Sequence, residues 1–438
     1  MLRTNLLRAF GVPVVALLAC TAGEENIQLD CPEAMVLGEP LAVRARGMMP
    51  GGAYTIVADR EDSLGRRWLS RATFEADATG MIEPARQRPA EGAYRDFDGL
   101  GLLWSASLAE PTPDDWQPPP PRDFSEIHLR VETADRQEAA ACTVRQWIRP
   151  PGIHSEGWGE SSSAELFLPQ QRPATPLPAI VFLGGSGGGR GWATRMAGLF
   201  AQRGYAALAV AYFRSEGLPE HLAQVPVETV FSAIDGLQKD PRIDDQRLAL
   251  MGYSKGAELA LLVASRRPEI KAVAAIAPGS SVFQGFKPPK FPTLSSWTID
   301  GVDLPFVPNA YDQKFFETFD GMYLWYRTLA QHEAVEEAAI PVEEIAGDIL
   351  LVSGVDDRIW PATAMAEQIV ARLYLAEFEH RVQHLAFPEA GHGIAAPPGE
   401  PTTDVAARLG GSAAGNAAAR EQSWRALEQF FTQSLSAP

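Results

Sequence analysis

The stretch of residues 248–262, LALMGYSKGAELALL, most constrains what this chain can fold into. Its first four residues form an apolar run of strand length, and residues 257–265 combine good helix formers with an apolar face, which predicts a helix. Between the two, residues 252–256 match G-x-S-x-G with Ser254 at the centre. Strand, tight turn with a serine, and helix together form the context of a nucleophile elbow, in which the serine hydroxyl stands above a sheet.

The acidic and basic partners that such a serine needs follow it in the chain in a definite order. Residues 349–354 read as an apolar strand, and Asp356 and Asp357 come directly after it. His392 then lies in a loop between two glycines. The order serine, aspartate, histidine is that of α/β-hydrolases. Because G-x-S-x-G alone occurs by chance in many chains, this order is what makes Ser254 a candidate nucleophile.

A second glycine-rich stretch predicts where the oxyanion of an acyl-transfer reaction would bind. Residues 179–183 form an apolar run typical of a buried strand, and residues 184–191 read GGSGGGRG. A phosphate-binding loop is excluded because no G-K-[ST] follows. In an α/β-hydrolase this loop supplies one oxyanion-hole N–H and the residue after the serine supplies the other. We therefore expect the backbone N–H groups of Lys255 and Gly185, with Ser186 as the second choice in the loop.

Length and pattern indicate two folded domains. A chain of 438 residues exceeds one typical core. Short alternating strands with Gly/Pro/Asp turns between residues 27 and 148 predict an immunoglobulin-like β-sandwich, and strands alternate with helices afterwards. We predict an N-terminal sandwich domain at 21–152 and, at 153–438, an α/β catalytic domain of the α/β-hydrolase fold, with a mostly parallel sheet flanked by helices. The net charge of −17 argues against a nucleic-acid partner and is compatible with a small-molecule substrate.

Residues 1–20 resemble a signal peptide of the lipoprotein type. Arg3 and Arg8 precede a short apolar stretch, and residues 17–20, LLAC, resemble a lipobox with Cys20 as the lipidation site. An ordinary secretory signal, a misread start codon, or a cytoplasmic protein with an apolar N-terminal strand are the alternatives. We therefore expect a protein of the bacterial cell envelope, periplasmic or anchored to the membrane through Cys20, with the cytoplasm as the alternative location.

The other two cysteines, Cys31 and Cys142, fall near the start and the end of the predicted sandwich. They do not have the spacing of metal ligands, and no histidine cluster accompanies them. In an oxidising compartment they would form one disulfide that joins the first and last strands. Two separately buried thiols are the alternative. No metal or redox cofactor is expected.

Residues 280–340 are a long mixed segment at a position where hydrolases often insert a lid or pocket elements. Its aromatic side chains either line a substrate pocket or simply pack the insertion. The candidates are Phe283, Phe286, Trp297, Tyr323 and Trp325.

Several motifs resemble one family, the acyl-CoA thioesterases related to bile acid-CoA:amino acid N-acyltransferase. The resemblance extends over nearly everything past residue 27. The motifs that carry it are SKGAEL at 254–259, GAY at 92–94, GLLWS at 101–105, RQWI at 145–148, VAYF at 210–213, IPVEEI at 340–345, and the closing residues Gly410, Gly411, Trp424, Phe430 and Phe431.

The resemblance implies a β-sandwich followed by an α/β-hydrolase domain that hydrolyses acyl-CoA thioesters to a free acid and CoA. Some family members carry a cysteine nucleophile and transfer the acyl group to an amino acid, whereas Ser254 favours water as the acceptor. The family's acid aligns with Asp357 rather than Asp356. The predicted lipoprotein signal departs from this pattern, because acyl-CoA is a cytosolic metabolite.

The predicted mechanism is acyl transfer through an acyl-serine intermediate. Ser254 attacks the carbonyl, His392 takes its proton and later activates water, and Asp357 orients His392. Three alternatives stay open: an envelope carboxylic-ester hydrolase or peptidase, an acyl-CoA N-acyltransferase, and a non-catalytic surface lipoprotein that binds through its sandwich.

Overall fold

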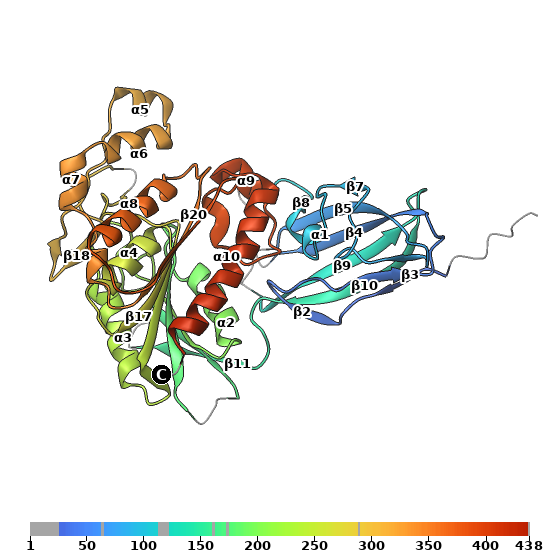
Figure 1. The fold of residues 1–438 in the computed structure, drawn as a ribbon, viewed down its shortest axis with the longest axis horizontal. Coiled ribbons are helices and arrows are strands. Elements are labelled where there is room, and N and C mark those ends of the chain that lie inside the picture. The colour runs from blue at the N-terminus through green and yellow to red at the C-terminus, as the bar shows by residue number, and fades with distance from the viewer. Residues whose placement is uncertain are drawn as a thin grey trace, which may run out of the picture.

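The structure is a computed structural model that describes residues 26–436 except 63–64, 113–121, 160–162, 172–174 and 288–289. It has a β-rich N-terminal part and a larger part of mixed strands and helices, side by side along the longest axis (Figure 1). The predicted signal and Cys20 lie outside the described residues, so both stay predictions. No helix among the described residues is long and apolar enough to span a membrane.

Two sheets of unequal size form the N-terminal part. In the described chain the smaller sheet has the order β1-β3-β6, from β1 (Gln28–Asp30), β3 (Arg44–Arg46) and β6 (Met81–Ile82). The larger has the order β2-β10-β9-β4-β5-β7, with β8 also paired to β5: β2 (Ala34–Val36), β10 (Glu138–Trp147), β9 (Phe124–Glu132), β4 (Ala53–Glu61), β5 (Arg67–Glu75), β7 (Glu91–Gly92) and β8 (Ser107–Leu108).

One apolar core lies between these sheets, as a sandwich requires. Ala45 and Ile82 of the smaller sheet pack in one cluster with Ile56, Phe74 and Val131 of the larger. Strand β5 alternates buried and more exposed side chains along most of its length, which is the period-2 pattern of a sheet with one buried face. The predicted β-sandwich is therefore present, although its two sheets differ strongly in size.

A disulfide joins Cys31, directly after β1, to Cys142 in β10. It therefore connects the smaller sheet to the larger one. Of the two alternatives left open by the sequence, the structure has the disulfide rather than two separate thiols.

The C-terminal part contains one large sheet, which within the described residues has the order β11-β12-β14-β13-β16-β17-β20-β21. The strands are β11 (Ile153–Trp158), β12 (Ala164–Pro169), β13 (Leu177–Leu183), β14 (Ala206–Val210), β16 (Ile243–Tyr253), β17 (Ile270–Ile276), β20 (Asp348–Gly354) and β21 (Val382–Phe387). From β14 to β21 all neighbouring strands are parallel, whereas β12 pairs antiparallel with both β11 and β14. This mostly parallel sheet is the one predicted for an α/β-hydrolase fold.

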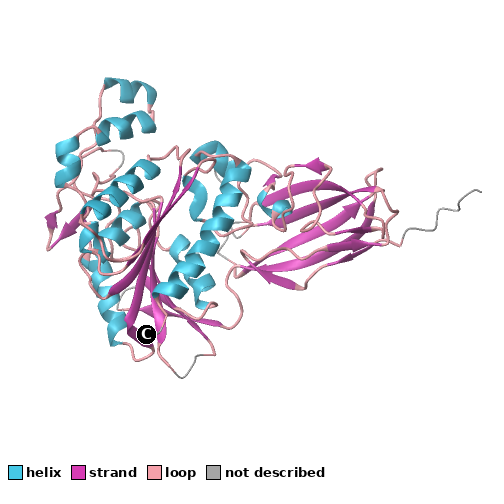
Figure 2. Cartoon of the chain, viewed as in Figure 1, coloured by secondary structure: helices cyan, strands magenta, loops and turns pink. Residues whose placement is uncertain are grey.

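Helices cover both faces of the large sheet (Figures 1 and 2), so its central strands are buried on both sides. One face packs against α3 (Glu228–Lys239), α4 (Lys255–Ala264) and α8 (Ala362–Leu375). The other packs against α2 (Gly191–Ala201) and α10 (Ala413–Ser434). The remaining helices are α1 (Gly101–Trp104), α5 (Gln313–Thr318), α6 (Gly321–Leu329), α7 (His332–Glu337), α9 (Thr403–Leu409), and the 3-10 turns η1 (Val342–Glu344) and η2 (His392–Ala395).

The short β15 (Val225–Pro226), which precedes the elbow in the chain, pairs with β18 (Trp297–Ile299) of the inserted segment. Strand β19 (Val302–Asp303) completes this small separate sheet. The closing helix α10 begins at Ala413, although the apolar pattern alone predicts a start near residue 421. Its first turn is rich in alanine and glycine, and the Ser412 side chain caps it by accepting from the N–H of Gly415. A polar cap rather than apolar spacing therefore marks this helix start.

Candidate active site

Ser254 occupies the turn between strand β16 and helix α4, with a φ of 56°. A non-glycine residue in the left-handed region stores backbone strain, which persists only where the surrounding structure enforces it. Only glycine fits at the two flanking positions, 252 and 256, because a larger residue would collide with the backbone. A Cβ at Gly256 would lie 2.2 Å from the carbonyl oxygens of Leu183 and Gly184, and one at Gly252 would meet backbone at a similar distance. The local sequence thus folds into the sharp turn that the G-x-S-x-G motif predicts.

The structure brings the three predicted partners into one hydrogen-bonded chain. The Ser254 Oγ lies 3.0 Å from His392 Nε2, and His392 Nδ1 lies 2.7 Å from Asp357 Oδ2. With Nδ1–H donating to the carboxylate, Nε2 is free to accept the serine proton. The other carboxylate oxygen of Asp357 accepts from the backbone N–H groups of Ile359 at 2.8 Å and Trp360 at 3.2 Å. All three side chains are nearly fully buried.

Asp356, the alternative acid, points away from this chain. Its carboxylate accepts from the N–H of Gly411 at 2.8 Å and pairs with Arg358 at 3.3 Å at the surface. The hydrogen-bonded position beside His392 is therefore occupied by Asp357. Asp356 instead ties its own turn to the chain around residue 411.

The two predicted oxyanion donors lie on either side of the serine turn. Lys255 is the first residue of α4, and a Cβ on Gly185 would be 3.2 Å from the Cβ of Ser254. The Tyr212 hydroxyl donates to the carbonyl of Gly185 at 3.3 Å and to the preceding carbonyl at 2.5 Å, which fixes the loop. Among the described residues, no acceptor is recorded for the N–H of Lys255, Gly185 or Ser186. The oxyanion assignments stay predictions.

Beneath the elbow lies a buried ion pair that the sequence analysis missed. Lys255 Nζ donates to both carboxylate oxygens of Glu258 at 2.7 Å and to the Ser296 hydroxyl at 2.8 Å. Glu258 also accepts from the Trp297 indole at 2.7 Å and from the N–H of Phe283 at 3.3 Å. Burial raises the pKa of Glu258, and the adjacent ammonium offsets part of that rise. The side chain of Lys255 is thus part of the interior, and only its backbone N–H is available to the site.

Aromatic side chains surround the histidine end of the hydrogen-bonded chain. Trp360 is almost fully buried, and its ring centroid lies 6.2 Å from that of His392. Phe283 and Trp325 of the inserted segment pack against Trp360, at 6.2 Å and 5.5 Å. Trp360 was also missed by the sequence analysis, although it follows the aspartate turn directly. These rings form an apolar wall beside the reacting groups.

The other aromatic candidates of the insertion serve packing. Trp297 is fully buried and binds Glu258 under the elbow. The Tyr323 hydroxyl donates to Asp312 at 2.7 Å, and Phe286 is half exposed. Packing of the insertion therefore fits Trp297 and Tyr323, whereas Phe283 and Trp325 contact Trp360 beside His392 and stay candidates for pocket lining.

Comparisons with known proteins agree with this architecture. The model described as the acyl-CoA thioester hydrolase/BAAT N-terminal region matches residues 38–157, and the model described as BAAT/acyl-CoA thioester hydrolase C terminal matches residues 225–437. Acyl-coenzyme A thioesterase 6 of Homo sapiens is 28% identical over 91% of this chain and 94% of its own length. Acyl-coenzyme A amino acid N-acyltransferase 2 of Mus musculus is 27% identical over 92% of this chain and 96% of its own length.

Solved structures are similar to a smaller share of the chain. The crystal structure of a dienelactone hydrolase-like promiscuous phosphotriesterase from metagenomic libraries has 14% identity and a TM-score of 0.41, covering 65% of this chain and all of its own. Acetyl xylan esterase 1 from Thermoanaerobacterium has 16% identity and a TM-score of 0.36, covering 74% and 86%. These similarities are too low to carry an argument about the site.

The mostly parallel sheet, its helices on both faces and the serine turn after β16 define an α/β-hydrolase. The two family models, which together match most of the sequence, show that the chain belongs to the acyl-CoA thioesterase/BAAT family. Fold and family together support hydrolase activity.

Proposed function

We propose that the protein hydrolyses acyl-CoA thioesters to a carboxylic acid and CoA through an acyl-serine intermediate. The observation that carries the proposal is the hydrogen-bonded chain from Ser254 through His392 to Asp357, in a chain whose relatives are named acyl-coenzyme A thioesterases. A serine as the attacking residue favours water as the final acyl acceptor.

In the first half-reaction the Ser254 Oγ forms a bond to the thioester carbonyl carbon while its proton passes to His392 Nε2. The carbonyl oxygen becomes an oxyanion, which the N–H groups of Lys255 and Gly185 stabilise; losing one such donor typically costs about 10²–10³ in rate. The C–S bond then breaks, and His392 returns the proton to the leaving thiolate. Asp357 keeps the imidazole oriented and stabilises its cation throughout.

In the second half-reaction water takes the place of the thiol. His392 removes a proton from the water, whose oxygen bonds to the acyl carbon, and the C–Oγ bond breaks. Ser254 recovers its proton from His392, and the carboxylic acid leaves. We assign the apolar part of the acyl group to the aromatic wall of Phe283, Trp325 and Trp360, whose rings pack against one another beside His392.

The test is thiol release from acyl-CoAs of graded chain length, run beside simple aryl esters, with the Ser254→Ala protein as the blank. Release of CoA that depends on chain length and is absent in the blank is the expected result. Cleavage of aryl esters with negligible CoA release would contradict the thioester assignment and support the alternative of an envelope ester hydrolase.

Transfer of the acyl group to an amino acid is the second candidate, because one relative is named an acyl-coenzyme A amino acid N-acyltransferase. Adding glycine to the same assay distinguishes the two reactions. Hydrolysis predicts free acid as the product at every glycine concentration, whereas transfer predicts an N-acyl amino acid.

We also propose that the protein resides in the bacterial cell envelope, anchored through Cys20. The support is the LLAC sequence at residues 17–20 together with the Cys31–Cys142 disulfide, because disulfides persist in oxidising compartments. Fractionation of cells that express the full chain and a Cys20→Ser variant tests this. Recovery of both proteins in the cytoplasmic fraction would contradict it.

A further inference from the structure

The peptide groups on both sides of His392 are held by one face of helix α10. The N–H of Gly391 donates to Asn416 Oδ1 at 2.9 Å. On the other side, the guanidinium of Arg420 donates to the carbonyl of Gly393 through Nε at 2.9 Å and through Nη2 at 2.7 Å. Asn416 and Arg420 are four residues apart, so they lie one above the other on the same side of the helix. His392 therefore sits between two fixed peptide groups.

Arg420 is an unusual choice for a purely structural contact. The side chain is 3% exposed, and among the described residues no carboxylate lies within ion-pair distance of it. All its recorded hydrogen bonds go to backbone carbonyls. Burial lowers the pKa of Arg420 to about 10. Burying a cation without a paired anion is costly. The rigid fork of guanidinium donors offsets that cost when it fixes the relative positions of several backbone carbonyls.

Two further donors hold the same turn. The Tyr253 hydroxyl, next to the nucleophile, donates to the carbonyl of His392 at 3.2 Å. The indole of Trp192, which follows the glycine-rich loop, donates to the carbonyl of Ala395 at 2.8 Å. The carbonyls of His392, Gly393 and Ala395 thus each accept from a different element of the fold. The position of His392 therefore depends on hydrogen bonds to the backbone of its turn as well as on the bond between its imidazole and Asp357.

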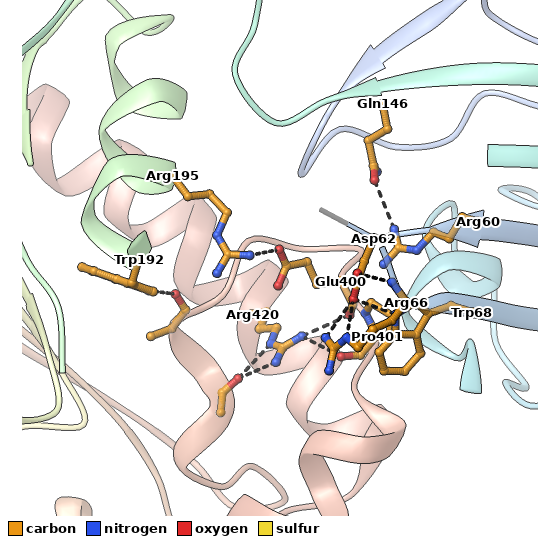
Figure 3. A network of polar contacts seen from close by, with 12 residues as sticks. Arg60, Asp62, Arg66, Trp68, Gln146, Trp192, Arg195, Glu400, Pro401 and Arg420 are labelled. Carbon is orange, nitrogen blue, oxygen red and sulfur yellow. Dashed lines mark hydrogen bonds and ion pairs between the residues drawn. The ribbon is translucent and has the colours of Figure 1, made fainter. Parts of the chain in front are cut away.

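The same arginine connects the histidine turn to the sandwich domain. Its Nη1 donates to the carbonyl of Glu400 at 3.1 Å, and the Glu400 side chain pairs with Arg195 (Figure 3). Two residues after Glu400, the N–H of Thr402 donates to the carbonyl of Trp104 at 3.0 Å, and the hydroxyl of the next residue, Thr403, donates to the carbonyl of Ala106 at 2.7 Å. Both acceptors belong to the sandwich domain, at and just after α1. Figure 3 shows this domain's Arg60 and Gln146 facing the same region.

We propose that Asn416 and Arg420 are positioning residues that hold His392 in register with Ser254, and that the sandwich domain contributes by anchoring segment 400–403. The inference rests on the proposed function, because it needs His392 to act on Ser254. It gives the N-terminal domain a role in catalysis without any of its residues touching the substrate. A displacement of the imidazole by about 1 Å is enough to cost ~10²-fold in rate.

The test compares Arg420→Met, Arg420→Lys and wild type with Arg425→Met, which changes an exposed arginine on the same helix. Each full-length protein is measured for its melting temperature, for the rate at which a fluorophosphonate labels Ser254, and for kcat and KM per labelled site. Counting only labelled sites removes any contribution from unfolded protein. Labelling does not depend on the identity of the substrate.

We expect Arg420→Met to lower the labelling rate and kcat per site by ~10–100-fold with KM changed less than about twofold, and Arg425→Met to change neither. Arg420→Lys recovers part of the rate, because an ammonium can still donate to Gly393 but lacks the fork that also reaches Glu400. Labelling and kcat within twofold of wild type in folded Arg420→Met would overturn the inference.

A second variant covers the case in which Arg420→Met does not fold. Asn416→Ala removes the acceptor of the Gly391 N–H and leaves no buried charge unpaired. We expect a several-fold fall in the labelling rate, and an unchanged rate would overturn the inference. A wild-type protein that is neither labelled nor active would overturn the proposed function and this inference together. Equal rates in wild type and variants would overturn this inference alone.

Discussion

The serine and the histidine of the site are positioned in two different ways. Ser254 is positioned by its immediate neighbours. The sharp turn after β16 requires glycine on both sides of Tyr253 to Lys255, because any side chain there would collide with the backbone. His392 begins the short 3-10 turn η2, whose peptide groups are fixed by side chains of α10, by Tyr253 and by Trp192. The position of Ser254 therefore depends on the local sequence, whereas the position of His392 depends on residues that are far away in the sequence.

The two halves also differ in how they use buried charge. Beneath the serine, the ammonium of Lys255 is matched by the carboxylate of Glu258. Behind the histidine, the guanidinium of Arg420 contacts only carbonyls. The Lys255–Glu258 ion pair anchors Phe283, Ser296 and Trp297 of the inserted segment to the elbow helix. Arg420 has no paired carboxylate and binds backbone carbonyls of the histidine turn instead.

The largest expected effect is on the histidine side. Asp357→Asn should lower kcat by about 10⁴, because the amide stabilises the wrong imidazole tautomer and no cation. Asp356→Asn is the matched control one residue away, and it should retain activity within about tenfold because Asp356 contacts Gly411 and Arg358 instead. Steady-state kinetics of both variants check this. Equal losses in the two would contradict the assignment.

The next effect is on the stability of the serine side. Glu258→Gln removes the anion and leaves the Lys255 ammonium buried, which should reduce the free energy of unfolding by about 3–5 kcal/mol. The double variant Lys255→Met, Glu258→Leu removes both charges and should recover most of that loss. Urea unfolding of the three proteins measures this. A loss below about 1 kcal/mol in Glu258→Gln would show that the pair does not hold the elbow.

Gly256→Ala should destabilise the protein by roughly 3 kcal/mol, the upper part of the usual range for overpacking. The added methyl would lie 2.2 Å from two carbonyl oxygens that cannot move without distorting β13. Gly191→Ala, at the first residue of α2, has no atom within 4 Å of the new Cβ and should be neutral or slightly stabilising. Thermal unfolding compares the two, and similar melting temperatures would weaken the argument that the turn is forced by sterics.

The smallest effect concerns the contact between the domains. Thr403→Val leaves the carbonyl of Ala106 without its donor and should cost about 1 kcal/mol. Thr432→Val removes a similar bond in an exposed turn of α10 and should cost less. Urea unfolding is again the measurement. A larger loss in Thr432→Val would contradict the importance given to the segment between His392 and the sandwich.

The comparison also explains how much of the molecule its sequence predicts. The elbow and the central strands follow from local apolar patterns and glycines, and the strands predicted at 179–183, 248–251 and 349–354 fall within β13, β16 and β20. Strands β11 and β12 were not predicted, and α10 was predicted to start too late. The sandwich was recognised from alternation, but the size of each sheet depends on pairing between distant strands.

For the site, the spacing of Ser254, Asp357 and His392 was enough to nominate all three. Glu258 and Arg420 were missed because their importance comes from burial, which depends on contacts with residues more than twenty positions away, such as Trp297 and Gly393. For Glu258, the signal in the sequence was a carboxylate within the apolar helical stretch 257–264, whereas Arg420 is followed directly by Glu421 and does not stand out. Contacts of this kind become visible only when the fold is known.

The most direct test of the account is to identify the acylated residue during turnover. Wild-type protein mixed with an acyl-CoA, quenched in acid and digested, should give a peptide containing Ser254 whose mass is increased by the acyl group, and the Ser254→Ala protein should give none. Continued CoA release from Ser254→Ala, or an acyl group on another residue, would contradict the assignment of Ser254 as the nucleophile.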